Sequence, residues 1–295
     1  MESAPIPDSR RDRTTTMVIT GLVIVLAVAS VALRLYTRIS MRQGIKADDW
    51  LILAAVIIAL LTVSILLWGN IINPRSVWIS ENTDPSYTYQ PQDHVYLQIS
   101  FATSALYFTV ASTSKLGILV TYNRLFASSR AFRNQLWAAG ALVSIFWIGC
   151  TEAALLACVP LEWAWANSLE DPRYCFNYNL FWAAAGACEV ALDVVIVAMP
   201  QYLWYAMMMV VLTVGDLSSV IIITGLVRCI TGYAPGKRVP SYSNSEVWTL
   251  VHGGVSIVCA SLPVFYPLFR TVLRRWRSPS PSRLRSGGEG GTEVT

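Results

Sequence analysis

Seven apolar runs, each long enough to cross a lipid bilayer, constrain this chain more than any other feature of its sequence. A membrane-spanning helix needs roughly 20 consecutive, mostly apolar residues. The composition agrees, because 54% hydrophobic and only 14% charged residues is unusual for a soluble domain. The sequence therefore predicts an all-α membrane protein, a seven-transmembrane helix bundle. The seven runs are residues 17–36, 50–68, 99–122, 136–157, 179–200, 204–228 and 247–269.

Several residues predict where these helices begin and end. Asp48 and Asp49 start the second helix and are expected to cap its free backbone N–H groups. Pro200 has no backbone N–H, and its ring clashes with the preceding helical turn. We therefore expect a break or a tight hairpin at Pro200, although the fifth and sixth runs could otherwise form one long helix. The first run has the alternative of a cleaved signal peptide, because Arg10, Arg11 and Arg13 precede it, but it is long for one.

Basic residues predict the orientation of the bundle, because cytoplasmic flanks of membrane helices carry an excess of Lys and Arg. Residues 38–46, 124–133 and 270–285 are rich in them and would share one side of a seven-helix bundle, whereas Lys237 and Arg238 go against the trend. This asymmetry predicts an N-terminus outside and a C-terminus in the cytoplasm.

Three segments follow from these predictions. We expect an extracellular or lumenal segment over residues 1–16, the membrane domain over 17–270, and a basic, Ser/Gly-rich disordered cytoplasmic tail over 271–295. The lipid bilayer is then the main partner. The sequence predicts a multi-pass protein of the plasma membrane or the endoplasmic reticulum.

Carboxylates inside the apolar runs indicate a functional site. Glu189 and Asp193 lie one helical turn apart in the fifth run, and Asp216 lies in the sixth. An ionised group at the centre of a spanning helix costs roughly 2.5 to 3.5 kcal/mol, so such groups normally face a polar interior. If the protein is an enzyme, these three residues are its candidate catalytic acids. Glu189 and Asp216 could share a proton, or each could simply bind a neighbouring hydroxyl group.

Counting residues from the predicted helix ends places several polar residues at common depths. At about 1.5 Å per residue, Lys115 and Asp193 both lie about 10 Å from the cytoplasmic end, where they could form an ion pair. Glu152 and His252 lie nearer the outside. We expect Lys115, Glu152 and His252 to line a polar cavity that binds a ligand. The structural alternatives are a lysine that extends to the membrane surface and an interior histidine with no role in binding.

The cysteines and the absent motifs narrow the chemistry. Cys158 and Cys175 flank a short loop on the predicted outer side, where an oxidising environment permits a disulfide, although sequence alone does not fix the pairing. The sequence has no CxxC, GxSxG or HExxH motif and no phosphate-binding glycine-rich loop. His94 and His252 form no metal motif, and the seventh run has no lysine that could hold retinal. We expect no metal, no cofactor and no nucleic-acid partner.

An ordered set of motifs resembles a known family. Arg34 and Arg38 precede the sequence GIKADDW at residues 44–50, and KLGILVTYNRLF follows at 115–126. With the later elements, this order over residues 17–270 resembles the fungal rhodopsin-domain integral membrane proteins, which include surface receptors of the Pth-eleven type and a membrane protein of the satratoxin gene cluster. The resemblance implies a seven-helix, receptor-like protein. The later elements are Cys158-Val159-Pro160, Trp163, Cys175, Asp193 seven residues before Pro200, Gly215 before Arg228, Leu262-Pro263 and Pro267-Leu268.

The function hypotheses follow mainly from this resemblance. The leading hypothesis is a receptor-like fungal membrane protein that binds a small apolar or amphipathic ligand in a polar intramembrane cavity and can be linked to a specialised-metabolite gene cluster. The alternative is a membrane-embedded, cofactor-independent cyclase or isomerase that uses a buried carboxyl group as a general acid. A proton-coupled exporter has less support, because no internal repeat of helices is evident. Coupling to a G protein is not expected, because the basic loop that the family usually carries between helices five and six is absent.

Overall fold

Long helices make up most of this protein. The computed structural model describes residues 9–42, 44–73, 88–125, 130–166, 171–204 and 208–277. Within these ranges, the side chains of residues 9–17, 125, 200–204, 208–218, 242–244 and 266–277 are outside the description. The helices are α1 (Ser9–Ser40), α2 (Ala47–Ile72), α4 (Pro91–Leu125), α5 (Arg130–Leu155), α6 (Trp163–Ala166), α7 (Tyr178–Trp204), α8 (Met208–Gly232) and α9 (Tyr242–Arg277).

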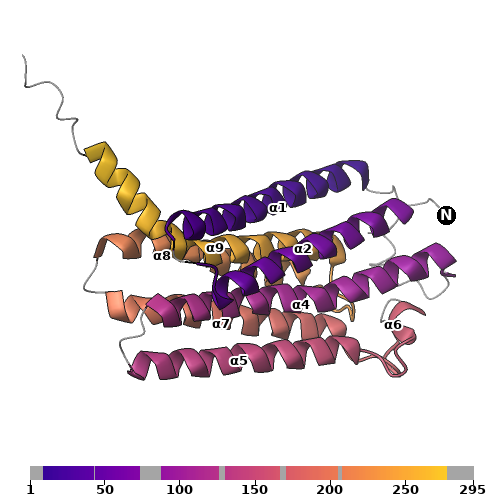
Figure 1. The fold of residues 1–295 in the computed structure, drawn as a ribbon. Helices are drawn as coiled ribbons and strands as arrows, with labels where there is room; N and C mark the ends of the chain where they lie inside the picture. The colour runs from indigo at the N-terminus through magenta and orange to yellow at the C-terminus, as the bar shows by residue number, and fades with distance from the viewer. Residues whose placement is uncertain are drawn as a thin grey trace, which may run out of the picture.

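Each of the seven apolar runs forms one long helix, which confirms the all-α fold (Figure 1). Six of these helices are long and apolar enough to span a membrane within the described residues. The seventh, α8, is apolar over Ser219–Gly232, the part of it whose side chains are described. The chain is therefore a multi-pass membrane protein.

The helix ends differ from the predicted ones in three places. α1 begins at Ser9, before the expected start at residue 17, and α9 continues to Arg277, so the first part of the expected disordered tail is helical. The fifth and sixth runs form two separate helices, as predicted, but the predicted position of the break is wrong, because α7 runs through Pro200 to Trp204. A membrane helix tolerates a proline when its surroundings satisfy the freed backbone group.

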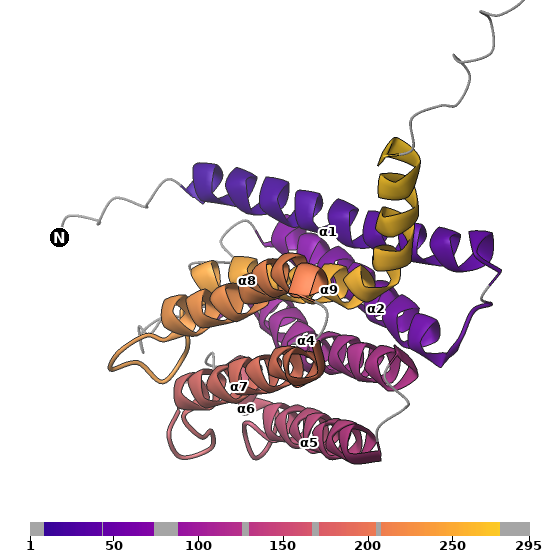
Figure 2. The same ribbon diagram turned by 90° about the vertical axis from the view of Figure 1, so that its left-hand side faces the viewer.

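The helices pack around α4, which contacts α2, α5, α6, α7 and α9. α1 packs against α9 and α2, and α8 packs between α7 and α9, as the view along the bundle shows (Figure 2). Gly117 permits the close approach of α4 to α2, because a Cβ atom there would lie only 2.8 Å from Ile52 Cγ1. Close packing of this kind at small residues is typical of membrane helices.

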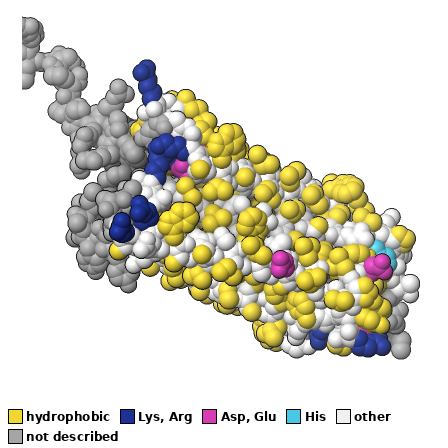
Figure 3. All heavy atoms as spheres, turned by 60° about the horizontal axis from the view of Figure 1, so that its bottom comes forward, with side chains coloured by type: hydrophobic (Ala, Val, Ile, Leu, Met, Phe, Trp, Pro, Cys, Tyr) yellow, Lys and Arg dark blue, Asp and Glu magenta, His cyan; other side chains and the backbone are white. Residues whose placement is uncertain are grey.

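The outer surface of the bundle suits a bilayer. Large apolar side chains such as Val25 and Ile145 are two-thirds exposed on its flanks. Figure 3 shows hydrophobic side chains along one flank, with the visible Lys and Arg side chains near the two ends. We call the end that carries Cys158 and Cys175 the disulfide end, and the end that carries Arg34 the arginine end.

Candidate functional site

Five ionisable side chains meet inside the bundle. Lys115 of α4, Glu189 and Asp193 of α7, Arg228 of α8 and His252 of α9 form this buried ion cluster. Their side chains are at most 6% exposed. Because charged groups are costly in a membrane unless they pair, the cluster is the main polar feature of the interior.

Glu189 lies at the centre of the buried ion cluster. Its carboxylate accepts hydrogen bonds from Arg228 Nη1 at 2.6 Å, from Tyr107 Oη at 2.7 Å and from Lys115 Nζ at 3.2 Å. Hydrogen bonds from two cationic groups, one of them as short as that from Arg228, are the geometry expected around an ionised carboxylate. Glu189 thus joins α7 to both α4 and α8.

Arg228 is held between two aromatic rings. The guanidinium carbon lies 4.2 Å from the Tyr107 ring centre and 4.5 Å from the Trp182 ring centre. Such cation–π contacts stabilise a desolvated cation by up to about 2 kcal/mol. Nε donates to Thr249 Oγ1 at 3.1 Å. From the sequence, Arg228 was identified only as a helix end and as part of the family resemblance. The available signal was charge balance, because Glu189 and Asp193 together need a second cation besides Lys115.

Asp193 and His252 complete the cluster. Lys115 Nζ lies 3.0 Å from Asp193 Oδ1, so the structure brings together the two residues that were expected to pair. His252 Nε2 faces both carboxylates, 3.4 Å from Glu189 Oε1 and 3.6 Å from Asp193 Oδ2. Its Nδ1 lies 3.2 Å from Thr224 Oγ1.

Two predicted site residues are not among the described residues of the buried ion cluster. Glu152, expected to line the polar cavity, is exposed on α5 and makes no ion pair with the described residues. Its depth was estimated from the sequence, but depth does not determine which face of a helix a residue occupies. Asp216 belongs to α8, and its side chain lies outside the described residues.

A cavity of about 70 Å³ lies beside the buried ion cluster, between α1, α2, α4, α7 and α9. This volume exceeds what one water molecule needs. Tyr107, Trp182 and Thr249 line the cavity and also contact Arg228, so they form a shared wall. The lining carries hydroxyl groups among apolar side chains: Thr62, Ser100, Thr103, Ser104, Ser245 and Thr249 beside Ile24, Ala27, Ala59, Val63, Leu66, Val110, Leu250 and Ile257.

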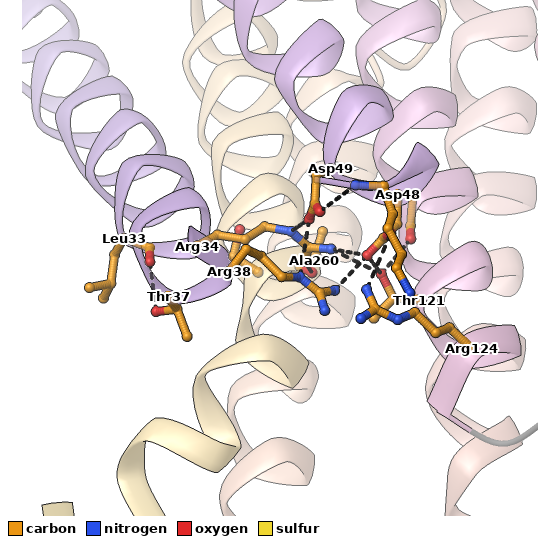
Figure 4. Close-up of polar contacts among 12 residues, drawn as sticks. Leu33, Arg34, Thr37, Arg38, Asp48, Asp49, Thr121, Arg124 and Ala260 are labelled. Carbon is orange, nitrogen blue, oxygen red and sulfur yellow. Dashed lines mark hydrogen bonds and ion pairs between the residues drawn. The ribbon is translucent and has the colours of Figure 1, made fainter. Parts of the chain in front are cut away.

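A second ionic group lies at the arginine end (Figure 4). Arg34 donates from Nη2 to Asp48 Oδ2 at 2.6 Å and from Nε to Asp49 Oδ1 at 2.8 Å, while Arg38 Nη2 donates to Asp48 Oδ2 at 2.7 Å. Arg34 Nη1 also donates to the Ala260 carbonyl oxygen at 2.8 Å. We call Arg34, Arg38, Asp48 and Asp49 the arginine cluster.

The arginine cluster has a structural role. Asp49 Oδ2 accepts from the Lys46 backbone N–H at 3.1 Å, so this aspartate caps the start of α2 as expected. Arg34 Nη2 also lies 3.2 Å from Thr121 Oγ1 of α4. The cluster therefore joins α1, α2, α4 and α9 at one end of the bundle.

The loop at the disulfide end is held by covalent and polar contacts. Cys158 and Cys175 form a disulfide, with their sulfur atoms 2.03 Å apart. Arg238 Nη2 donates to the Cys175 carbonyl oxygen at 2.7 Å. In the same loop, the hydrogen bonds from Arg173 hold the pKa of the exposed Asp171 carboxyl below its ordinary value.

Comparison with known proteins identifies the family of this chain. The sequence model of the fungal rhodopsin domain matches residues 33–271, most of the chain. The chain belongs to the fungal rhodopsin domain family. This is a seven-transmembrane family, in agreement with the seven long helices. No solved structure matches the chain.

Two fungal relatives of this family member carry descriptive names. The polyenoic acids biosynthesis gene cluster protein Ba17b of Metarhizium anisopliae is 23% identical over 269 residues, which cover 84% of this chain and 71% of the relative. The receptor GIN3 of Arthrobotrys oligospora is 23% identical over 282 residues, which cover 90% of this chain and 64% of GIN3. The chain thus spans about two thirds of the length of these relatives.

Proposed function

We propose that this chain is a receptor-like membrane protein that binds a small apolar or amphipathic ligand in the cavity between α1, α2, α4, α7 and α9. The observation that carries the proposal is the shared wall: Tyr107, Trp182 and Thr249 line the cavity and also hold Arg228. The similarity to GIN3, which is named as a receptor, supports this assignment, and the similarity to Ba17b, which is named as a gene cluster protein, supports a link to a specialised-metabolite gene cluster.

We place the disulfide end on the outer or lumenal side of the plasma membrane or the endoplasmic reticulum. A disulfide persists in an oxidising compartment, and Cys158 and Cys175 are paired. The arginine end then faces the cytoplasm, as the excess of basic residues predicts.

Ligand binding would act on helix packing through the shared wall. A ligand that contacts Thr249 or the Tyr107 ring displaces groups that position the Arg228 guanidinium. A polar network in a low-dielectric interior loses free energy when only part of its hydrogen bonds are made. Arg228 and Glu189 should therefore move between discrete arrangements. A ligand that binds one arrangement more tightly increases the population of that arrangement of α7, α8 and α9. The size of the shift is set by the difference between its affinities for the two arrangements.

The geometry gives less support to the membrane cyclase or isomerase. That mechanism needs a protonated carboxyl group that contacts the substrate. Among the described residues, Glu189 and Asp193 do not line the cavity, and Glu189 accepts hydrogen bonds from two cations. The receptor-like function uses the same carboxylates as fixed charges.

Two matched glycine substitutions test the proposal. A Cβ atom on Gly253, which lines the cavity, meets only Val110 Cγ1 at 3.9 Å, so Gly253→Leu should fill the cavity without a backbone clash. Gly140 of α5 has nothing within 4 Å of its Cβ position, so Gly140→Leu is the control. Each variant replaces the native gene in the source fungus, beside a deletion strain, and transcript and metabolite profiles are recorded with equal membrane levels verified.

The outcomes separate the hypotheses. We expect Gly253→Leu to reproduce the transcript changes of the deletion strain and Gly140→Leu to match the wild type. Full activity of Gly253→Leu would contradict ligand binding in this cavity. If the deletion strain accumulates an intermediate that microsomes with the wild-type chain convert, the protein is an enzyme and the receptor proposal is wrong.

A further inference from the structure

We infer that the cavity selects a small neutral carbonyl compound, a ketone or an ester, whose oxygen accepts hydrogen bonds from Ser245 and Thr249 of α9. The inference rests on the proposed function, since it assigns a chemical class to the ligand of the same cavity. Both residues line the cavity. They lie four residues apart, so their side chains share one face of the helix.

Each of these two hydroxyl oxygens already accepts a hydrogen bond from a neighbouring helix. Trp182 Nε1 donates to Ser245 Oγ at 2.9 Å, and Arg228 Nε donates to Thr249 Oγ1 at 3.1 Å. The direction of both bonds is fixed, because an indole and a guanidinium group carry donors and no acceptor. A hydroxyl group also has one proton, which these bonds do not use. Ser245 and Thr249 are therefore left to act as donors.

The protons of Ser245 and Thr249 have no acceptor among the residues that the structure describes. Glu246 also lines the cavity, but its carboxylate accepts from Tyr96 Oη at 3.3 Å rather than from either hydroxyl group. The cavity is thus the place where both protons can find an acceptor.

The other hydroxyl groups of the lining are used differently. Thr62 Oγ1 donates to a carbonyl oxygen of its own helix at 2.8 Å, and Thr103 and Ser104 each donate to the Ser100 carbonyl oxygen at 2.9 Å. The Ser100 hydroxyl makes no hydrogen bond with a described residue, so it can turn either to donate or to accept. In the described lining, the two α9 hydroxyls are the pair whose role as donors is fixed.

One carbonyl oxygen can satisfy both donors. Cβ atoms four residues apart on a helix are separated by about 5 to 6 Å, and two O–H···O bonds of about 2.8 Å cover that distance. A carbonyl oxygen has two lone pairs and no proton of its own to place. A hydrocarbon ligand would leave both donors unpaired, and a site built to hydrogen-bond its ligand rejects an analogue that lacks the matching group. Apolar side chains such as Ile24 and Leu66 suit an uncharged remainder, which loses little solvation energy on entry.

The hydrogen bonds continue from the ligand into the buried ion cluster. Arg228 donates to Thr249 through Nε and to Glu189 through Nη1, at 2.6 Å. The ring of Trp182, which holds Ser245, lies 4.5 Å from the guanidinium carbon of Arg228. Linked hydrogen bonds in a low-dielectric interior strengthen one another. A carbonyl compound on Thr249 therefore stabilises the arrangement in which Arg228 binds Glu189.

Three probes with the same arrangement of heavy atoms test the inference: 2-hexanone, 2-hexanol, and 2-methyl-1-hexene, which has a CH₂ group in place of the oxygen. Binding to the full chain in lipid nanodiscs is measured by isothermal titration calorimetry, with the signal of empty nanodiscs subtracted to remove partition into lipid. The readout is the ratio of ketone affinity to alkene affinity, because a distorted cavity weakens both probes whereas a lost donor weakens only the ketone.

The variants separate the donors from the shape of the cavity. Thr249→Val removes one donor and keeps the branched side chain, Thr249→Ser keeps the hydroxyl group, and Ser245→Ala removes the other donor. Thr103→Val is the matched control, because it removes from the same cavity a hydroxyl group whose proton already binds a backbone carbonyl. Gly253→Leu measures the signal that remains when the cavity is filled.

We expect the wild type to bind 2-hexanone at least tenfold more tightly than the alkene, with 2-hexanol between them. Thr249→Val and Ser245→Ala should each lower the ratio at least threefold, while Thr249→Ser and Thr103→Val should leave the ratio unchanged. Equal affinities for ketone and alkene, with binding lost in Gly253→Leu, would overturn the carbonyl class and leave the ligand cavity standing. Binding of 2-hexanol at least as tight as that of 2-hexanone would also overturn the carbonyl class.

Two further outcomes bear on the site itself. A ratio that persists in both Thr249→Val and Ser245→Ala would overturn the role of the two hydroxyl groups. Binding that does not change in Gly253→Leu would overturn both this inference and the proposed ligand cavity.

Discussion

Neutralising Glu189 should destabilise the bundle more than any single change on its surface. Its carboxylate is the partner of Arg228 and Lys115 and accepts from Tyr107, all within 3.2 Å. Glu189→Gln keeps the size of the side chain but leaves the two cations without this counter-charge. Removal of one partner from a buried ion pair costs about 3 to 5 kcal/mol. The folded-to-unfolded ratio should therefore fall by roughly a hundredfold to a few thousandfold.

The assay is reversible unfolding with SDS in mixed micelles. Unfolding is followed by tryptophan fluorescence and by far-ultraviolet circular dichroism, whose transitions must coincide for a two-state free energy to be meaningful. Glu152→Gln is the matched control, because it removes a carboxylate from an exposed position of α5. We expect this control to leave the free energy of unfolding unchanged or to increase it.

A double variant tests whether the loss comes from unmatched charge. Glu189→Gln with Lys115→Met removes one charge of each sign, so the free energies of the two single variants should not add, and a coupling of at least about 1 kcal/mol is expected. If Glu189→Gln loses no more stability than Glu152→Gln, the buried ion cluster does not hold these helices together and the reasoning is refuted.

Two further predictions concern packing and the arginine cluster. A Cβ atom on Gly225 would lie 2.8 Å from Val190 Cγ2 and 3.3 Å from His252 Cε1, so Gly225→Ala should destabilise by roughly 1 to 3 kcal/mol in the same SDS titration, whereas Gly140→Ala should stabilise slightly; equal effects would contradict the close packing. Arg34→Lys cannot reproduce the bonds of the guanidinium group and should cost roughly 3 kcal/mol, and a loss no larger than that of Arg173→Lys on the exposed loop would exclude a stabilising role.

The sequence predicted the number of helices and the depth of the ion pair along them. It did not predict which side of each helix faces the interior. Apolar length alone identified all seven runs, because a membrane imposes a minimum span. Lys115 and Asp193 meet because residues at equal depth can pair when they face each other. Arg228 was missed because a basic residue near a helix end is normally expected to extend toward the membrane surface.

The position of Glu152 could have been predicted from the buried face of α5. Leu136, Ala139 and Val143 are buried in α5, at the three- and four-residue spacing of one helix face. Glu152 follows Val143 by nine residues, which is about 900° at about 100° per residue and therefore places it on the opposite side of the helix. Applied to Glu189 and Asp193, the same rotation gives about 40°, so these two residues share a face and both reach the buried ion cluster.

The motifs that carry the family resemblance and the residues that line the cavity have different locations. Arg34, Arg38 and Asp48 belong to the quoted motifs and meet in the arginine cluster, where they join helices. Glu246 and Gly253 line the cavity and belong to none of those motifs. Because a fold and its binding site can change separately, the family's markers report the scaffold rather than the ligand. Members with the same arginine cluster can therefore bind different ligands, and the residues that line the cavity should determine which.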